Sequence, residues 1–530
     1  MINEIHVANF QEDQRAPLAV GIDLGTTQSV VAYVDPTGRP QTIVNAEGDK
    51  LTPSVVLFEE EQVIVGKEAA KAISTNASDV AQCMKRELGR RFFHQELGGR
   101  HYPPEALEAW ILYKIHHDTK VVLGDFRQVV VTVPAYFDEV RRKATQDAGY
   151  IAGLDVIDII NEPTAAAIAF GHEQGFLNDS TMGSRSVRIL VYDLGGGTFD
   201  VTIMEISGHN FVTLATDGDV QLGGQDWDHR LVDLVANAFY EEHDLDPRDD
   251  PNALGRLWRD CEDAKRTLSV RRKVTIPCDF MGKTIRYQIT QERFEDTTKD
   301  LLDRTSFTTR QTLSAAGLTW PEIDRVLLVG GSTRMPAVVK MLTSLSEKQP
   351  DRSIAADEAV AFGAALHAEH LLTRHAGHTP PFSVKNVNSH SLGVVATEPS
   401  TRRKRNAIII PRNTKLPVSA KRVFKTQNDN QNSVLVRIAE GENAAADECV
   451  QLGKCTVRDL PPNLPAQTPI EVRFKYLENG RLTVMVNVMG TDRWVKRELV
   501  RDNSLTPEQL DDWREFVTGF RHSEHLEPPP

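Results

Sequence analysis

Two short segments of the chain carry aspartate, glycine and threonine in the same order. Residues 20–31 read VGIDLGTTQSVV, and residues 191–202 read VYDLGGGTFDVT. In both, a β-branched run leads into Asp-Leu-Gly, a turn of glycine and threonine follows, and a second β-like run begins, which is typical of a strand–turn–strand unit. Glycine lets backbone N–H groups approach an anion, threonine adds hydroxyl donors, and an aspartate at a strand end can hold a metal ion through water. The repetition predicts a duplicated fold that clamps a nucleoside triphosphate between its halves.

The repeated turns supply the first candidate residues. Asp23 and Asp193 are candidates for holding Mg²⁺, which keeps most of its waters and prefers one or two carboxylates. The candidates for binding phosphate are Gly25, Thr26, Thr27, Gly195, Gly196, Gly197 and Thr198.

A third glycine turn, GGSTRMP at residues 330–336, follows a predicted strand and precedes a predicted helix. Its flat glycine surface and helix N-terminus suit a nucleotide base or phosphate, and a guanidinium can stack on a base. The candidates in this turn are Gly330, Gly331, Ser332 and Arg334.

One predicted helix, residues 251–269, carries four polar residues on a single face by their i, i+3, i+4, i+7 spacing. These residues are Glu262, Lys265, Arg266 and Ser269. The face is either an exposed, salt-bridged stripe or a clamp for adenine and ribose.

Composition bounds the class of protein. A chain of 530 residues is long enough for several domains. Its net charge of −13 argues against a general nucleic-acid binder. Five cysteines without a CxxC pair indicate reduced, buried thiols. The first 17 residues lack the apolar core of a signal peptide, and no apolar run is long enough to span a membrane, so we expect a cytoplasmic protein.

The pattern of elements divides the chain. Residues 1–17 read as a flexible extension, and residues 18–376 alternate β-branched strands with amphipathic helices, as an α/β domain does. A Gly- and Pro-containing stretch at 373–381 predicts a linker, which we place at 377–382. Short alternating segments then predict an all-β domain over 383–503. The segment SLTPEQL predicts a helix start, so residues 504–530 should form a short helix and a disordered tail.

Taken together, these motifs resemble the heat shock protein 70 (DnaK-type) chaperones. The matching segments are GIDLGTTQSVV, VTVPAYFDEVRRKATQDAGYIAGL, IINEPTAAAIAFG, VYDLGGGTFDVTI, LGGQDWD, CEDAKRTLS and LLVGGSTRMP, in family order over residues 20–376. The resemblance implies an actin-like, two-lobed ATPase domain followed by a β-sandwich that grips extended peptide.

Roles follow from the resemblance, position by position. Asp23, Glu162 and Asp193 support Mg²⁺ and its waters, Asp200 orients the attacking water, and Asp23 with Asp200 also holds K⁺. Lys71 contacts the γ-phosphate, and Thr198 is the position at which family members autophosphorylate. Pro134 and Arg142 relay the presence of the γ-phosphate. The adenosine pocket consists of Glu262, Lys265, Arg266, Ser269, Gly331, Ser332, Arg334 and Asp357, beside Gly223 and Gly224 of LGGQDWD.

The resemblance also implies an activity and partners. ATP would be hydrolysed slowly, as a timer for binding unfolded or extended polypeptide, with a J-domain co-chaperone and a nucleotide exchange factor as partners. We expect mostly a monomer, without nucleic acid or membrane as partner. Val434, after the turn Asp429-Asn-Gln431, is the candidate for lining the peptide pocket.

Three departures from the family bear on the β domain. The linker region 373–381 is basic and proline-containing instead of acidic and leucine-rich, which puts interdomain coupling in question. The loop at 397–406, TEPSTRRKRN, is cationic where the family is apolar, and it indicates a solvated loop or acidic partners. The long helical lid is expected to be absent, so peptide should exchange quickly.

Two other functions are compatible with parts of the sequence. The ATPase could be a switch whose β domain binds one dedicated partner. Alternatively, the fold could serve a small-molecule kinase such as a sugar kinase, although Glu162-Pro163-Thr164 and residues 223–226 match the chaperones. Analysis of the product, phosphate in water or phosphate on a sugar, distinguishes a kinase from the other readings.

Overall fold

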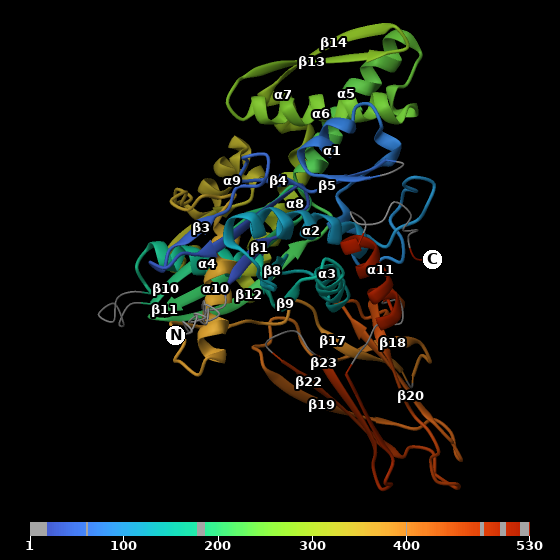
Figure 1. The fold of residues 1–530 in the computed structure, drawn as a ribbon. Helices are drawn as coiled ribbons and strands as arrows, with labels where there is room; N and C mark the ends of the chain where they lie inside the picture. The colour runs from blue at the N-terminus through green and yellow to red at the C-terminus, as the bar shows by residue number, and fades with distance from the viewer. Residues whose placement is uncertain are drawn as a thin grey trace, which may run out of the picture.

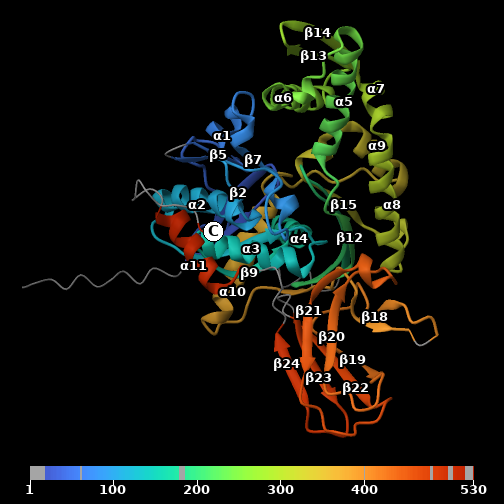
Figure 2. The same cartoon turned by 90° about the vertical axis from the view of Figure 1, so that its right-hand side faces the viewer.

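The computed structural model describes residues 18–59, 62–177, 186–398, 400–477, 482–498, 505–519 and 529. The predicted extension at 1–17 and nearly all of the predicted tail lie outside this part of the chain. Figure 2 shows two α/β lobes side by side, and in both Figures 1 and 2 a β-sandwich lies beneath them.

Lobe I is built on a sheet whose central strands carry the first repeated motif. In spatial order the strands are β3 (Pro40–Thr42), β2 (Gln28–Val34), β1 (Val20–Asp23), β8 (Gln128–Val133) and β9 (Asp155–Asn161), with β4 (Thr52–Pro53) also pairing with β2. Helices α2 (Pro104–Leu123) and α3 (Glu139–Ile151) pack on it. A smaller unit consists of β5 (Val55–Phe58), β6 (Val63–Val65), β7 (Val80–Gln82), α1 (Lys67–Ala72), η1 (Ala77–Asp79) and η2 (Met84–Glu87).

Lobe II repeats the arrangement around the second motif. Its sheet has the order β15 (Arg325–Val329), β10 (Ser186–Leu194), β11 (Phe199–Ser207), β12 (Asn210–Asp219) and β16 (Ser383–Lys385). Its other elements are α5 (Gly224–His243), η3 (Pro247–Asp249), α6 (Pro251–Leu268), β13 (Lys273–Phe280), β14 (Lys283–Thr290), α7 (Gln291–Thr297), α8 (Lys299–Ala315), η4 (Trp320–Glu322), η5 (Gly331–Arg334) and α9 (Pro336–Ser346).

The strand pairing confirms the predicted duplication. In lobe I, β1 pairs antiparallel with β2 and parallel with β8, and in lobe II, β10 pairs antiparallel with β11 and parallel with β15. Asp23 lies opposite Val30, and Asp193 lies opposite Asp200, so each hairpin carries its carboxylates at the turn.

Two helices join the lobes by crossing very closely. Helices α4 (Glu162–Glu173) and α10 (Ala359–His375) meet where a Cβ on Gly363 would lie 1.8 Å from the carbonyl oxygen of Ala165. A Cβ on Gly21 would lie 2.1 Å from the backbone nitrogen of Ala365, so β1 also needs glycine at this contact. The two glycines therefore fix the distance between the lobes' inner layers.

The β-sandwich consists of two four-stranded sheets, as the alternating segments predict. One has the order β18 (Lys404–Ile410), β17 (Leu392–Thr397), β20 (Val434–Glu440) and β21 (Val450–Val457). The other has the order β19 (Val418–Lys425), β22 (Pro469–Tyr476), β23 (Leu482–Val488) and β24 (Trp494–Glu498), and η6 (Ala446–Glu448) lies between β20 and β21.

The linker region differs from its prediction. Helix α10 continues to His375, and Ser383–Lys385, expected at the start of the β domain, forms β16 and pairs in parallel with β12. Phe382 is buried in the core shared by α4 and α10. The segment without a leucine run thus joins the nucleotide domain as an edge strand, because its alternate residues find apolar neighbours there.

The sandwich is docked against both lobes by polar contacts. Arg412 Nη2 lies 2.9 Å from Asp217 Oδ2, and the backbone N–H of Thr216 donates to Asn413 Oδ1 at 3.0 Å. On the lobe I side, the backbone N–H of Glu139 donates to Glu440 Oε2 at 3.2 Å, and the Tyr476 hydroxyl donates to the Glu139 carboxylate.

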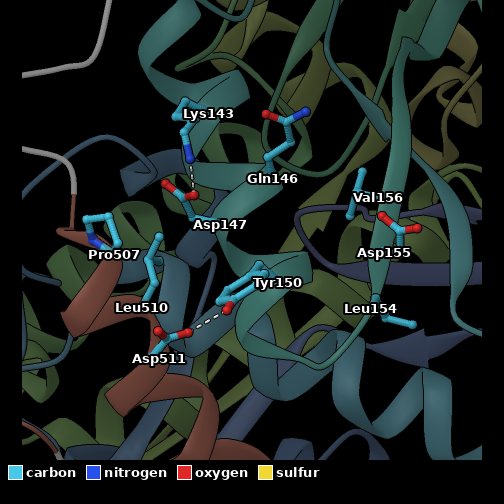
Figure 3. A pocket seen from close by; sticks show the side chains of 10 residues that line it. All are labelled: Lys143, Gln146, Asp147, Tyr150, Leu154, Asp155, Val156, Pro507, Leu510 and Asp511. Carbon is cyan, nitrogen blue, oxygen red and sulfur yellow. Dashed lines mark hydrogen bonds and ion pairs between the residues drawn. The ribbon is translucent and has the colours of Figure 1, made fainter.

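The predicted C-terminal helix is confirmed as α11 (Pro507–Gly519), and it packs on α2 and α3. Trp513, Phe516 and Val517 are at most 3% exposed and belong to the lobe I core. Figure 3 shows Tyr150 of α3 bonded to Asp511 of α11, at a surface pocket of about 310 Å³ between the two helices.

Two smaller expectations can be compared with the structure. The five cysteines form no disulfide, and all but the half-buried Cys83 are buried, as predicted. Within the described ranges, none of the helices combines the length and apolar character needed to cross a bilayer.

Candidate functional site

The two repeated turns meet face to face between the lobes. A Cβ on Gly196 would lie 2.4 Å from Thr27 Oγ1, and a Cβ on Gly197 would lie 2.4 Å from Thr26 Cγ2. The glycines of one hairpin therefore contact the threonines of the other, so the two repeated turns lie together between the lobes. Because the two turns touch, the backbone N–H groups of both lie close together, where one anion could contact them.

Two more glycine segments converge on the second turn. The backbone N–H groups of Gly224 and Gln225 donate to the carbonyls of Gly195 and Gly196 at 3.0 and 2.9 Å. Ser332 Oγ also donates to the Gly195 carbonyl, at 2.9 Å, and Gly330 has a φ of 82° that favours glycine. Because Cβ atoms would clash at Gly223, Gly224 and Gly330, the three segments form a tight, backbone-lined cradle.

Carboxylates line the floor of this cleft. Glu162, Asp193 and Asp200 are each less than a tenth exposed, with Asp200 at 1%, and Asp23 is partly buried. Burial, with the charge of Glu162 added, raises the pKa of Asp23 to about 7 and that of Asp200 to about 8. The pKa of Asp193 is raised well above its usual range by the same causes. The cluster has an excess of negative charge.

Lys85 on η2 is the cation that faces these carboxylates. Its side chain is 2% exposed, and Nζ lies 2.5 Å from both Glu162 Oε1 and the Leu24 carbonyl oxygen. Burial alone would lower the pKa of Lys85, but Glu162 and Asp23 outweigh it and the pKa is raised. The lysine is therefore held charged at the base of the cleft.

The prediction for Lys71 is wrong in its position. Lys71 lies on α1 with 65% of its side chain exposed and pairs with Glu68 at 2.7 Å, one turn away on the same helix. A lysine in a short surface helix is solvated, as its composition alone would suggest. Lys85 was missed because residues 84–90, MKRELGR, were not matched to any motif. The available signal was the pair of apolar residues Met84 and Leu88, which the structure buries.

This donor set fits a nucleotide with its Mg²⁺. Four carboxylates, three of them buried, face one lysine and call for added positive charge, and the backbone cradle beside them calls for an anion. In the described residues, no three His, Cys, Asp or Glu side chains are placed to bind a metal together. A water-rich Mg²⁺ shared with phosphates suits that arrangement, with Asp23 and Asp193 as its nearest predicted carboxylates.

The predicted adenosine residues fall into three pairs. Lys265 Nζ donates to the Gly224 carbonyl and to Asp228 at 2.9 and 2.6 Å, at the rim of the cradle, and Ser269 Oγ donates to the Lys265 carbonyl at 3.3 Å. Glu262 and Arg266 form an exposed pair at 2.6 Å, as the salt-bridged reading predicts. Arg334 and Asp357 pair with each other at the surface beyond Ser332, so both stand at the third glycine turn.

A continuous chain of hydrogen bonds leads from Asp200 to the β-sandwich. Asp200 Oδ1 accepts from the backbone N–H of Tyr136, two residues after Pro134, at 2.9 Å. Arg142 donates to the carbonyls of Ala135 and Phe137 and to Asn161 Oδ1. The same loop is bonded from the other side, because Ser389 Oγ donates to the Ala135 carbonyl and His390 Nε2 lies 2.9 Å from the Tyr136 carbonyl.

Val434, the pocket candidate, is 4% exposed and belongs to the sandwich core. It begins β20, at the end of the strand opposite to Glu440 and the nucleotide domain.

The fold and site together define a two-lobed nucleotide-binding protein with a docked β-sandwich. The chain matches the Hsp70 protein family over residues 19–97 and 93–525. It is 39% identical over 504 residues to "Chaperone protein DnaK" of Halobacterium salinarum, covering 94% of this chain and 77% of that relative. It is 36% identical over 510 residues to proteins of the same name from Thermotoga neapolitana and Thermotoga maritima, covering 94% of this chain and 83% of each relative.

The chain therefore belongs to the Hsp70 family of ATP-dependent chaperones. The family membership argues against the sugar-kinase reading, and no finding favours the reading of a switch with one dedicated partner.

Proposed function

We propose that this chain hydrolyses ATP slowly between its lobes and that the state of the nucleotide controls how the β-sandwich holds unfolded or extended polypeptide. The carrying observation is the hydrogen-bonded loop 134–142, which contacts Asp200 in the cleft and Ser389 and His390 at the base of the sandwich.

In this proposal, each polar residue of the cleft has its own role in ATP hydrolysis. Mg²⁺ would supply charge that balances the phosphates, near Asp23 and Asp193, with K⁺ beside Asp23 and Asp200. Asp200, through its carboxylate, holds the attacking water, and Lys85 neutralises charge at the γ-phosphate in the role expected of Lys71. Thr198, in the second turn, lies beside the same phosphate. Catalysis of this kind depends on positioning and charge stabilisation.

The proposal also covers the client, the partners and the domains of the protein. Client segments bind the β-sandwich near Val434, and Pro134 with Arg142 relays the nucleotide state. A J-domain co-chaperone and a nucleotide exchange factor act on a mostly monomeric, cytoplasmic protein. The domains are bounded as 18–376 and 383–503, except that Ser383–Lys385 contributes a strand to the first.

The test is ATP turnover by the full chain, with and without an extended apolar peptide. Peptide should raise turnover severalfold, and Ser389→Ala, which removes one bond from the loop, should reduce that stimulation while leaving basal turnover. Basal turnover with no response to any peptide would contradict the proposed coupling, and phosphate transfer to a small molecule would contradict the reaction.

A further inference from the structure

The β17–β18 hairpin carries a concentrated positive charge on an acidic protein. Arg402 and Arg403 lie in its turn, and Lys404 and Arg405 begin β18, all four exposed. The only acidic residue between Leu392 and Ile410 is Glu398, which lies 3.2 Å from Arg405 Nε. Neither Arg402 nor Arg403 has an ion pair among the residues that the structure describes. A local cluster of this kind, within a net charge of −13, selects for anions.

The turn's own geometry does not call for arginine. Arg402 has a φ of 56°, in the left-handed region where glycine or asparagine is more easily accommodated. The charge at this position is therefore not explained by the local backbone.

The hairpin leaves the sheet beside an open strand edge. β17 pairs with β20 only from Leu392 to Val394, opposite Glu440 to Ile438, and beyond Val394, in the part of the chain that the structure describes, it pairs with β18 alone. Within the described residues, Val434–Arg437 of β20 pair with β21 alone. Figure 2 shows the β18 side of the sandwich projecting sideways from β20 and β21.

That edge suits an extended polypeptide. Free backbone N–H and C=O groups on one side of a strand can take up an added strand, and side-chain contacts then set its specificity. Leu435, 49% exposed, and Arg437 flank the edge, and β17, the strand that parts from this edge, leads directly into the cationic hairpin.

We propose that this sandwich selects acidic client segments, with Asp or Glu next to an apolar anchor residue. The proposal rests on the proposed function, since it names the class of polypeptide held by the same domain. The planar guanidinium of arginine can donate two parallel hydrogen bonds to one carboxylate, which favours acidic over uncharged side chains. Exposed charges of this kind act mainly on selectivity and association rate.

The experiment measures binding of three labelled peptides to the full chain in ADP by fluorescence anisotropy. The peptides share one leucine-rich centre and carry acidic, uncharged or basic flanks. We expect the acidic peptide to bind about fivefold more tightly than the uncharged one, as two exposed ion pairs would give, and the basic peptide to bind most weakly. The order should flatten in about 0.5 M salt, where the screening length is a few ångström.

Two variants separate the hairpin from overall charge. Arg402→Glu with Arg403→Glu should invert the order, whereas Arg402→Lys with Arg403→Lys should keep it. Arg39→Glu with Arg100→Glu makes the same change of net charge at exposed positions of lobe I and should leave the order intact. Thermal unfolding of each variant checks that it is folded.

The outcomes distinguish this inference from the function on which it rests. Binding of the uncharged peptide without preference for the acidic one would overturn the inference and leave the function standing. No binding of any peptide would overturn peptide binding itself. If oligothymidylate competes as well as the acidic peptide and is lost in the same charge-reversal variant, the site takes polyanions in general and the polypeptide assignment is wrong.

Discussion

At the residue scale, Lys85 and Lys71 offer a matched comparison. Lys85→Ala leaves Glu162 and its neighbouring carboxylates without their cation, in the cleft that we propose binds the γ-phosphate. We expect ATP to remain bound and its turnover to fall by about 10²-fold or more. Lys71→Ala removes only an exposed pair with Glu68 and should change neither quantity. Single-turnover hydrolysis and nucleotide affinity, measured on both variants, check the assignment; a normal rate for Lys85→Ala would refute it.

A second residue-scale prediction concerns Asp200. In the unaltered chain the Tyr136 N–H donates to Asp200 Oδ1 at 2.9 Å. Asp200→Asn keeps an oxygen that can accept this hydrogen bond, but it removes the negative charge proposed to act on the attacking water. Turnover should therefore fall about 10²-fold while nucleotide affinity changes little. Calorimetric titration with ATP, beside the rate, is the measurement. Loss of affinity in proportion to rate would mean that Asp200 acts in binding.

The sequence predicted the aspartates and glycines of the cleft because a repeated motif constrains both copies at once. It did not separate Lys85 from Lys71, because each lies within a short helical segment, and the apolar neighbours Met84 and Leu88 do not by themselves place Lys85 in the cleft. What distinguishes them is tertiary: η2 runs beneath Leu24 and Glu162, whereas α1 lies on the surface. Residue roles that depend on contacts between distant elements are not available from local pattern.

At the element scale, α11 is held by its apolar face. Trp513 is 3% exposed, with ring centroids 5.8 Å from Tyr102 and 5.6 Å from Phe516. Trp513→Ala should cost about 3 kcal/mol and release α11 from α2 and α3. Hydrogen exchange across residues 507–519 measures the release. Trp494→Ala is the control, because that tryptophan is 63% exposed on β24 and should leave α11 protected.

Elements were predictable to the extent that their local signals were strong. The start of α11 was visible from Pro507 and the cap before it, and the alternating segments predicted over 383–503 include the strands β20, β22 and β23. The surface on which α11 packs was not visible, because the spacing of Trp513, Phe516 and Val517 says only that one face is apolar. β16 was missed because a three-residue edge strand has almost no periodicity to detect.

At the scale of the whole molecule, the docking of the sandwich on lobe I buries two carboxyl groups. Burial raises the pKa of Glu139 to about 7, against the opposing charge of Arg142, and burial with Asp138 and Glu139 raises the pKa of Glu440 well above its usual range. Tyr476 and His390, the latter with its pKa lowered by burial, face the same interface. Both glutamates are thus protonated more readily in the docked form than in separated domains.

The sign of the pH dependence follows from this difference. In separated domains the pKa values of the two glutamates return toward 4.5. Above pH 4.5 the docked form therefore binds more protons than the separated domains do. The glutamates' contribution to docking is fully present below pH 4.5; that of Glu139 is lost as the pH rises through about 7, and that of Glu440 as the pH rises through its own raised pKa. With a non-hydrolysable ATP analogue, small-angle scattering should therefore show a more extended molecule at pH 8 than at pH 6. Glu440→Gln, neutral at every pH, should flatten this change, whereas Glu448→Gln, at an exposed position of the same domain, should not. A scattering profile that is independent of pH in the unaltered chain would show that these carboxyls do not govern docking.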